Sequence, residues 1–198
     1  PWSMLNAYAV FANGGYGVQL HLISKVTDAN SKVLMEAQPV NAGESAVRVL
    51  NERNAFVMDS LLKEVARSGT AARAYATLKR ADIGGKTGTT NDSHDAWFAG
   101  YGGDLVAVAW MGFDQPRPLG ERETGGGLAL PIWISYMARA LNGVPDAPRT
   151  APAGIVELGG EYYYVEHQPG QGVASVGIED GLPPEEKAKR ETVREQIF

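Results

Sequence analysis

The chain has 198 residues, enough for one domain or for one domain with a short appendage, and 44% of them are apolar, as in a folded protein. Its 18 basic and 23 acidic side chains give a net charge of −5 without any long basic run, which argues against a nucleic-acid partner. The absence of cysteine excludes disulfides, thiolate metal sites and cysteine nucleophiles.

The two sequence features that would indicate membrane insertion are missing. No apolar stretch approaches the roughly 20 residues that a bilayer crossing needs, and no charged-then-apolar leader opens the chain. The sequence begins at Pro1, and helix-like apolar spacing starts within a few residues. We therefore expect the chain to be a piece of a longer protein, with any membrane anchor elsewhere in that protein.

The first part of the chain predicts a helix and then a β-hairpin. Residues 2–13 have apolar side chains at helical spacing, and Gly14-Gly15 supplies a stop. In residues 18–22 apolar and polar side chains alternate, as in a strand. Residues 28–31 are typical of a turn, and residues 32–37 are again strand-like, so we expect the two segments to pair.

The middle of the chain predicts two helices followed by a sheet. Asn51 is typical of an N-cap, apolar residues then recur on one side of the helix, and Gly69 ends it. A shorter helix is expected over residues 71–78. Three strands then predict an antiparallel meander with a tight turn before the last strand, over residues 83–90, 95–101 and 105–113.

The last part begins with three glycines and a strongly apolar segment. We predict a helix over residues 128–141 with Pro131 in its first turn, and its apolar character on most sides predicts deep burial. A connector, one or two strands, a glycine-rich loop and a charged helix are expected over residues 145–152, 154–165, 167–182 and 185–197. The order of all these elements predicts an α+β fold with an antiparallel sheet flanked by helices.

The most informative segment is the predicted strand that contains Lys86-Thr87-Gly88-Thr89. A bare Lys-Thr-Gly triplet occurs often by chance, and a strand with a solvent-facing lysine would explain it. In serine acyltransferases that handle β-lactams, however, the triplet is the third of three elements, after Ser-x-x-Lys and Ser-x-Asn. The surrounding sequence must decide between these two interpretations.

The residue types of this segment suit the binding of a peptide with a free carboxylate. Side chains alternate along a strand, so Lys86 and Gly88 point one way, and Thr87 and Thr89 point the other. If the strand borders a cleft, its free backbone groups can pair with an extended peptide. The lysine ammonium and the two hydroxyls suit a carboxylate, and Gly88 leaves room for the peptide. The backbone N–H of Thr89 is placed to stabilise an oxyanion, which in such sites contributes about 3–4 kcal/mol.

A nucleophile for this chemistry is harder to find in the chain. Ser60 and Lys63 match Ser-x-x-Lys on one helix face, and residues three apart on a helix can interact. The pair lies close before Lys86, however, and no asparagine occurs between Lys63 and Lys86 to supply a Ser-x-Asn element. We interpret the Ser60 helix as a packing element and expect the nucleophile to be absent from this chain.

The sequence around the triplet closely resembles bifunctional (class A) penicillin-binding proteins over about Met4 to Pro145. The similar segments, in chain order, are residues 7–15, 91–92, 95–101, 108–114, 116–120, 123–126 and 130–133. So many linked segments are far more specific than the triplet alone. In that family the Ser-x-x-Lys and Ser-x-Asn elements precede the part similar to residues 7–15, so here they would precede Pro1.

The resemblance implies a fold and an activity. It implies residues 1–145 as the C-terminal part of a β-lactamase/transpeptidase-like domain and leaves residues 146–198 as a connector and tail. The implied enzyme is a periplasmic serine D,D-transpeptidase of peptidoglycan biosynthesis, anchored in the inner membrane, which cross-links stem peptides ending in D-Ala-D-Ala and binds β-lactams. Lys86, Thr87, Gly88 and Thr89 would bind the substrate, with the Thr89 amide at the oxyanion, and the N-terminal remainder of the protein would act with them. No cofactor or metal is implied.

Two other interpretations stay open at this point. In the first, the chain alone forms a structural half-domain that is inactive without its remainder. Alternatively, the protein is a relative of the serine β-lactamases or D,D-carboxypeptidases.

Three other groups of residues are given less specific interpretations. The three histidines, His21, His94 and His167, are too dispersed to predict a metal site, although the position of His94, four residues past Thr90, is compatible with the border of the cleft. Asp92 and Asp95 are expected to shape a turn rather than to act as an acid and base. The large aromatic residues are interpreted as core rather than as a sugar platform, namely Trp97, Phe98, Trp110, Phe113 and Trp133.

Overall fold

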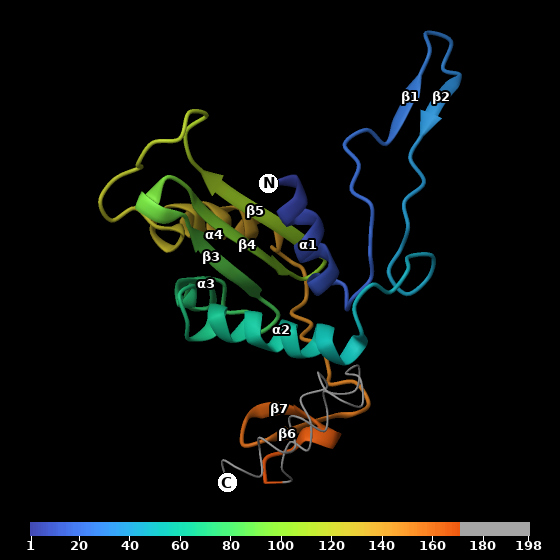
Figure 1. The fold of residues 1–198 in the computed structure, drawn as a ribbon. Coiled ribbons are helices and arrows are strands. Elements are labelled where there is room, and N and C mark those ends of the chain that lie inside the picture. The colour runs from blue at the N-terminus through green and yellow to red at the C-terminus, as the bar shows by residue number, and fades with distance from the viewer. Residues whose placement is uncertain (171–198) are drawn as a thin grey trace, which may run out of the picture. The chain divides into compact units, whose positions relative to one another are not determined.

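The computed structural model describes residues 1–170, which belong to two compact units, Pro1–Ala153 and a second that begins at Gly154. The first unit contains an antiparallel sheet in the order β3 (Gly84–Thr89), β4 (Ala96–Gly102) and β5 (Leu105–Met111). In the described part of this unit, four α-helices accompany the sheet (Figure 1): α1 (Trp2–Ala12), α2 (Glu52–Arg67), α3 (Ala72–Leu78) and α4 (Leu130–Ala140). The predicted α+β class, the antiparallel meander and the four helices are confirmed.

Local sequence signals set the limits of α2. The Asn51 side chain accepts a hydrogen bond from the Arg53 backbone N–H, as expected of an N-cap. The helix ends at Ser68, and the chain then passes Gly69, where a Cβ would lie only 2.9 Å from Val65 Cα. The cap and the glycine were both readable from the sequence, which explains why the predicted helix was correct.

The C-terminal end of α1 combines a local signal with a distant partner. Gly14 and Gly15 have φ values of 86° and 102°, in the region that glycine adopts at low cost, so the helix stops before them. The Arg149 guanidinium donates hydrogen bonds to the carbonyl oxygens of Phe11 and Ala12, which lack partners within the helix. The segment that follows α4 is thereby fastened to α1.

The hairpin differs from its prediction. The strands are β1 (Lys25–Thr27) and β2 (Val33–Glu36), so the strand predicted over residues 18–22 was wrong. Asp28 Oδ1 accepts two hydrogen bonds of 2.9 Å from backbone N–H groups of the turn, which aligns the residues directly beside the turn. Farther out, the same register would bring residues 18–22 opposite a segment that contains Pro39, which has no N–H to donate. In Figure 1 this hairpin extends away from the sheet and the helices.

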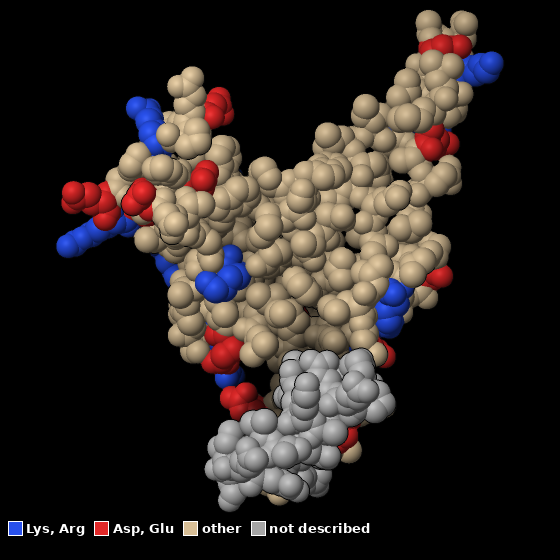
Figure 2. Space-filling view, viewed as in Figure 1, with Lys and Arg blue, Asp and Glu red and all other residues tan. Residues whose placement is uncertain are grey.

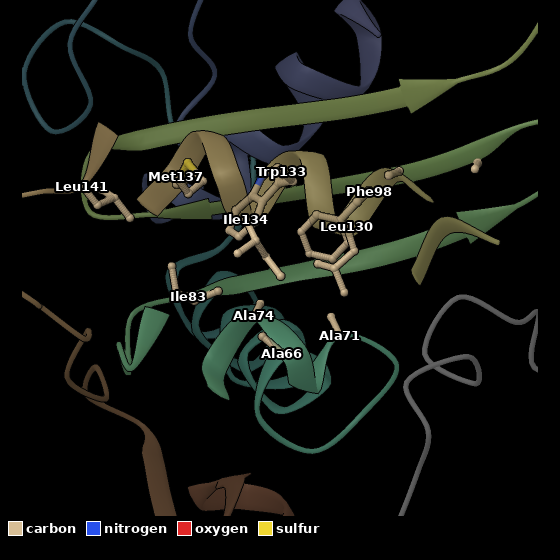
Figure 3. Packing of buried hydrophobic residues seen from close by; sticks show 12 residues of the cluster. Ala66, Ala71, Ala74, Ile83, Phe98, Leu130, Trp133, Ile134, Met137 and Leu141 are labelled. Atoms are coloured by element: carbon tan, nitrogen blue, oxygen red, sulfur yellow. The ribbon is translucent and has the colours of Figure 1, made fainter. Parts of the chain in front are cut away.

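The larger hydrophobic core lies between α4 and the sheet (Figure 3). Trp133 packs edge-on against Phe98 with ring centroids 4.9 Å apart, and its indole N–H donates to the Ala107 carbonyl oxygen at 3.0 Å. A buried indole with a satisfied N–H can pack without the penalty of an unpaired donor. Leu130, Ile134 and Met137 of α4 complete the contact with the sheet. Three alanines close the lower side in Figure 3, namely Ala66 of α2, Ala71 at the N-cap of α3 and Ala74 of α3.

A smaller core covers the opposite face of the sheet. Tyr8 of α1 and Leu62 of α2 pack there against Ala99 and Tyr101 of β4. Figure 2 shows that this view of the first unit is largely uncharged, with the acidic and basic side chains mainly toward its margins. The two cores place the sheet between helices on both faces, with α1 in front of it and α4 behind it in Figure 1.

Two predictions of burial were wrong in part. Ile132 and Tyr136 of α4 are 47% and 55% exposed, because only one side of the helix faces the sheet. Among the aromatic residues predicted to be core, Trp133 and Phe98 are buried, whereas Trp110 and Phe113 are each 38% exposed. None of the helices in the described residues combines the length and the apolar character that a membrane span requires.

The second unit contributes a small hairpin. Strands β6 (Ile155–Leu158) and β7 (Glu161–Tyr164) pair in antiparallel fashion, which confirms the strands predicted over residues 154–165. A single 3-10 turn, Val165–His167, follows β7. The charged helix predicted over residues 185–197, and most of the predicted glycine-rich loop, lie outside the described residues.

A buried ion pair fixes the start of β3. Arg80 donates from Nε and Nη2 to the two carboxylate oxygens of Asp82, at 2.9 and 2.6 Å. Asp82 Oδ2 also accepts a 3.0 Å bond from the backbone N–H of Gly103, in the turn between β4 and β5. Beyond α4, the Val144 carbonyl accepts from Arg80, and the Asp146 carboxylate accepts from the backbone N–H of Asp82. One pair therefore joins the start of β3, the β4–β5 turn and the segment after α4.

Removing the charge of Asp82 should destabilise the protein. We expect Asp82→Asn to lower the free energy of unfolding by about 3 kcal/mol, because it leaves the buried Arg80 guanidinium without its anionic partner. Chemical denaturation would measure the change. Asp104→Asn is the matched control, since Asp104 is exposed in the same β4–β5 turn and should change stability by less than about 0.5 kcal/mol. Equal effects of the two substitutions would contradict this role of Asp82.

The contribution of Asp82 should also depend on pH. Burial raises the pKa of this carboxyl, but the hydrogen bonds from Arg80 and from the backbone N–H groups outweigh burial and hold the pKa below its usual value. A carboxyl with a lowered folded-state pKa stabilises the fold above its unfolded pKa, about 3.9, and loses that contribution as pH falls through the folded value. The stability difference between wild type and Asp82→Asn should therefore be constant near pH 7 and shrink below about pH 4, as measured by denaturation at several pH values.

Candidate functional site

The strand β3 borders the sheet, and its two halves have different surroundings. In the described residues β3 pairs with β4 alone, so one edge of β3 has no neighbouring strand. Gly84 and Gly85 are buried, and α2 packs against the strand. Lys86 and Thr89 are exposed, and Thr87 and Gly88 between them are half-buried. The Lys-Thr-Gly-Thr segment is thus the accessible half of an edge strand.

Lys86 and Thr87 leave the strand on opposite faces but meet at its free edge. Gly88 would direct a side chain to the same face as Lys86. A Cβ on Gly88 would lie 3.2 Å from Trp97 Cβ, so the α-carbon of Gly88 lies beside Trp97. The Lys86 ammonium bends around the edge and donates to the carbonyl and hydroxyl oxygens of Thr87, at 3.0 and 3.2 Å. A cation and a hydroxyl are therefore adjacent where a bound peptide would pair.

The backbone of this segment presents hydrogen-bonding groups at the same edge. Thr90 donates its backbone N–H to the Asp95 carbonyl at 3.2 Å, in register with the β3–β4 ladder. In an antiparallel pair, successive residues direct their N–H groups alternately toward the partner strand and away from it. The N–H groups of Thr87 and Thr89 therefore point away from β4, toward the free edge.

Thr70 joins the site although its sequence context did not single it out. Its hydroxyl lies 2.8 Å from the hydroxyl of Thr87, which also accepts a hydrogen bond from the Lys86 ammonium. Thr70 comes from the short connection between α2 and α3 and is 17 residues away from Thr87 in sequence. No local pattern marks such a contact, because it arises from the way α2 packs along β3.

Thr89 is held from the other side by a glycine-rich turn. The backbone N–H of Gly125 donates to the Thr89 hydroxyl oxygen at 3.0 Å. Gly125 begins the π-helical turn Gly125–Ala129 that leads into α4. The sequence predicted a buried helix after three glycines here, and the structure adds the contact of the first of these glycines with β3.

Ser60 and Lys63 make other bonds than one with each other. The Ser60 hydroxyl donates to the Val57 carbonyl oxygen at 2.8 Å, and the Lys63 ammonium lies 2.7 Å from Asp59 Oδ2. These bonds, all within α2, agree with the interpretation of this helix as a packing element. They engage the two groups that a serine–lysine catalytic pair would need.

Asp59 also connects α2 to the sheet. The buried Tyr101 hydroxyl donates to Asp59 Oδ1 at 2.6 Å, and burial, followed by the charge of Asp59, raises the pKa of Tyr101 well above its usual range. Tyr101 lies over Gly84, where a Cβ would come within 2.7 Å of the phenol oxygen. Gly84, at the start of β3, is thus needed for α2, β3 and β4 to approach one another.

The described residues contain no group of three or more histidine, aspartate or glutamate side chains that could hold a metal ion.

Asp95 accepts a 2.8 Å bond from the Trp110 indole and donates its backbone N–H to the Thr90 hydroxyl at 2.7 Å. Asp92 has a φ of 56° inside the turn after β3. The bonds of Asp95 and the position of Asp92 in the turn agree with the turn-shaping roles expected of the two aspartates.

Comparison with known proteins agrees with this architecture. Residues 1–131 match the family described as the penicillin binding protein transpeptidase domain. Penicillin-binding protein 1A of Neisseria flavescens is 45% identical over 166 residues, which cover 84% of this chain and 21% of that protein. Penicillin-binding protein 1A of Pseudomonas aeruginosa is 38% identical over 203 residues, which cover 80% and 25%.

Solved structures give the same result. The crystal structure of penicillin-binding protein 1A from Haemophilus influenzae has a TM-score of 0.72 at 35% identity and covers 81% of this chain and 31% of its own. The D,D-transpeptidase domain of a peptidoglycan glycosyltransferase from Eggerthella lenta has a TM-score of 0.51 at 23% identity, covering 71% and 32%. The second likeness is informative about the fold alone.

The sheet, the helices on its two faces and these matches define a β-lactamase/transpeptidase-like fold, as predicted. The chain belongs to the penicillin-binding protein transpeptidase domain family. The resemblance to bifunctional penicillin-binding proteins is confirmed, since the curated relatives are penicillin-binding proteins 1A. The chain spans about a fifth to a quarter of the length of those relatives.

Gly85 should be essential to the packing beneath the site. A Cβ at Gly85 would lie 2.6 Å from Phe98 Cζ and 2.8 Å from the Ala99 carbonyl oxygen, so Gly85→Ala should lower the free energy of unfolding by about 2 kcal/mol. Gly126→Ala is the control, because its Cβ would meet no atom closer than 3.5 Å, and it should change stability by about 0.5 kcal/mol or less. Denaturation curves that shift equally for both variants would contradict this packing.

Proposed function

We propose that this chain is the part of a peptidoglycan D,D-transpeptidase that supplies the substrate-binding and oxyanion strand, and that the serine nucleophile lies in the remainder of the protein. The observation that carries the proposal is the exposed Lys-Thr-Gly-Thr half of an edge strand, in a chain that belongs to the penicillin-binding transpeptidase family. The full-length protein cross-links stem peptides through a serine acyl-enzyme and binds penicillin.

The substrate is a stem peptide that ends in D-Ala-D-Ala. Its backbone adds to the free edge of β3, and its terminal carboxylate is bound by the hydroxyls of Thr87 and Thr89 in the field of the Lys86 ammonium. The adjacency of Lys86 and Thr87 supports this assignment, since the two groups lie 3.2 Å apart. Gly88 leaves the approach of the peptide open.

The reaction proceeds in two acyl transfers. The serine hydroxyl attacks the carbonyl of the penultimate D-Ala, the amide C–N bond breaks, and the terminal D-Ala leaves as an amine carrying the proton that the hydroxyl lost. An amine of a neighbouring stem then attacks the ester, forming the cross-link amide and restoring the serine hydroxyl. The outward N–H of Thr89 binds the oxyanion formed in each step.

β-Lactams occupy the same cleft. Attack on the lactam carbonyl opens the ring, but its nitrogen stays tethered to the acyl group, so no leaving group departs and the enzyme remains acylated. We place this chain in the periplasm, where peptidoglycan is assembled, as part of a protein that is anchored in the inner membrane. Its partners are the stem peptides and the N-terminal remainder of the same protein, and the proposed chemistry uses no cofactor.

Two alternatives to this function are distinguishable from it. The bonds of Ser60 and Lys63 to other groups favour a chain that is inactive by itself, as a structural half-domain that needs its remainder. A serine β-lactamase or D,D-carboxypeptidase would share the strand but would release the acyl group to water. Trapping rather than turnover of the β-lactam separates the transpeptidase from a β-lactamase, and transfer of a stem-peptide acyl group to an amine rather than to water separates it from a D,D-carboxypeptidase.

Loss of the Lys86 ammonium should slow penicillin acylation. In the full-length protein we expect Lys86→Ala to reduce the second-order rate of labelling by a fluorescent penicillin about a hundredfold, because it removes the cation beside the carboxylate-binding hydroxyls. Lys32→Ala is the matched control, since Lys32 is an exposed lysine in the turn of the β1–β2 hairpin.

Peptide mapping of the labelled protein locates the acylated serine. We expect the label outside the 198 residues of this chain. Equal labelling rates for Lys86→Ala and wild type would remove the role assigned to Lys86, and a label on Ser60 would overturn the proposal that the nucleophile lies elsewhere.

A further inference from the structure

We infer that Gly125 is a positioning residue, whose backbone N–H orients the Thr89 hydroxyl so that its proton is directed at the substrate carboxylate. The inference rests on the proposed function and adds to it a second segment, 36 residues beyond Thr89 in sequence. Gly125 touches no substrate in this account. It acts through Thr89, and the property it controls is the preference of the site for an anionic ligand.

A hydrogen bond from Gly125 fixes the role of the Thr89 hydroxyl. The Gly125 N–H donates to the Thr89 hydroxyl oxygen at 3.0 Å, so the hydroxyl acts as the acceptor in this bond. A hydroxyl has one proton to donate and two lone pairs to accept. With one lone pair held by an N–H group, the hydroxyl proton must point elsewhere, and Thr89 is an exposed residue of β3. The bond thus leaves Thr89 ready to donate to an acceptor that arrives from solvent.

The Gly125 N–H is available as a donor because of its place in the turn. Gly125 is the first residue of the π-helical turn, and the first N–H groups of a helix have no partner within it. Two later N–H groups of the turn are bonded locally, since Gly127 donates to the side chain and the carbonyl of Thr124, and Leu128 donates to the same carbonyl. These caps fix the turn, so that the Gly125 N–H points at β3 rather than at solvent.

The backbone of Gly125 lies in close contact with the backbones of β3 and β4. A Cβ on Gly125 would lie 2.3 Å from the Trp97 carbonyl oxygen and 2.4 Å from the Gly88 carbonyl oxygen. Both of these atoms belong to backbone, which cannot move aside as a flexible side chain can. Gly125 is buried against the β3–β4 pair, and only a residue without a side chain brings its N–H this close to Thr89. Glycine is therefore required at position 125 because any side chain would prevent the hydrogen bond to Thr89.

The test compares a penicillin with its methyl ester, using the full-length protein. The ratio of their acylation rates reports recognition of the carboxylate, and it cancels changes that affect both ligands alike. We expect Gly125→Ala to lower this ratio about tenfold, the value of one hydrogen bond. Gly127→Ala is the matched control in the same turn, because its Cβ would meet only the Thr124 hydroxyl at 3.5 Å, and it should leave the ratio unchanged.

A second variant removes the donor without adding any atom that could clash. Glycolic acid in place of Gly125 replaces the N–H by an ester oxygen, and we expect it to lower the ratio as Gly125→Ala does, even if the alanine variant folds poorly. Thr89→Val removes the hydroxyl through which Gly125 acts. The ratio should fall about tenfold in Thr89→Val, and adding the glycolic-acid change should lower it no further.

Each other outcome overturns the inference. An unchanged ratio in the glycolic-acid variant, an equal loss of rate for the acid and the ester, or an additive loss in the double variant would each show that Gly125 does not act through the Thr89 hydroxyl. Failure of the proposed function is distinguishable from these results, because wild-type protein would then show no acylation by penicillin.

Discussion

The position of β3 depends on the ion pair between Arg80 and Asp82, which precedes the strand and is bonded on several sides. A buried charge is tolerated only when it is paired and its hydrogen-bonding capacity is used, so the network permits few geometries. Asp82 reaches the β4–β5 turn through Gly103, and Arg80 reaches the segment after α4 through Val144. The strand that carries Lys86 therefore starts from a point fixed by three parts of the chain.

Close approach of backbones is the second constraint, and glycine satisfies it. Gly85 lies against Phe98 and Ala99 on one side of the sheet, and Gly125 lies against Gly88 and Trp97 farther along. At both places a methyl group would overlap atoms that cannot withdraw. The strand β3 is thus tightly packed at its start and contacts the Gly125 turn near its end. Residues 86–89, which carry the site, stay half-buried or exposed. Rigid surroundings of this kind hold a binding site in the geometry that its ligand needs.

The edge position of β3 then determines which groups meet. Alternation sends Lys86 and Thr87 to opposite faces, yet the long lysine side chain curves back so that its ammonium lies 3.2 Å from the Thr87 hydroxyl. The same alternation directs the N–H of Thr89 away from β4. In an interior strand the outward backbone groups would be hydrogen-bonded to a second neighbouring strand. An edge strand leaves them available, which is why this part of the sheet suits a peptide ligand.

Much of this protein follows from local sequence. The helix limits were predictable because caps and glycines act on adjacent residues, as Asn51 and Gly15 do, and the linked motifs around Lys86 identified the family. The tertiary structure decided the exposed side of α4 and the contacts of Thr70 and Gly125 with β3, which join residues 17 and 36 apart. Periodicity and capping are properties of neighbouring residues, whereas the contacts of an edge strand depend on how separate elements pack.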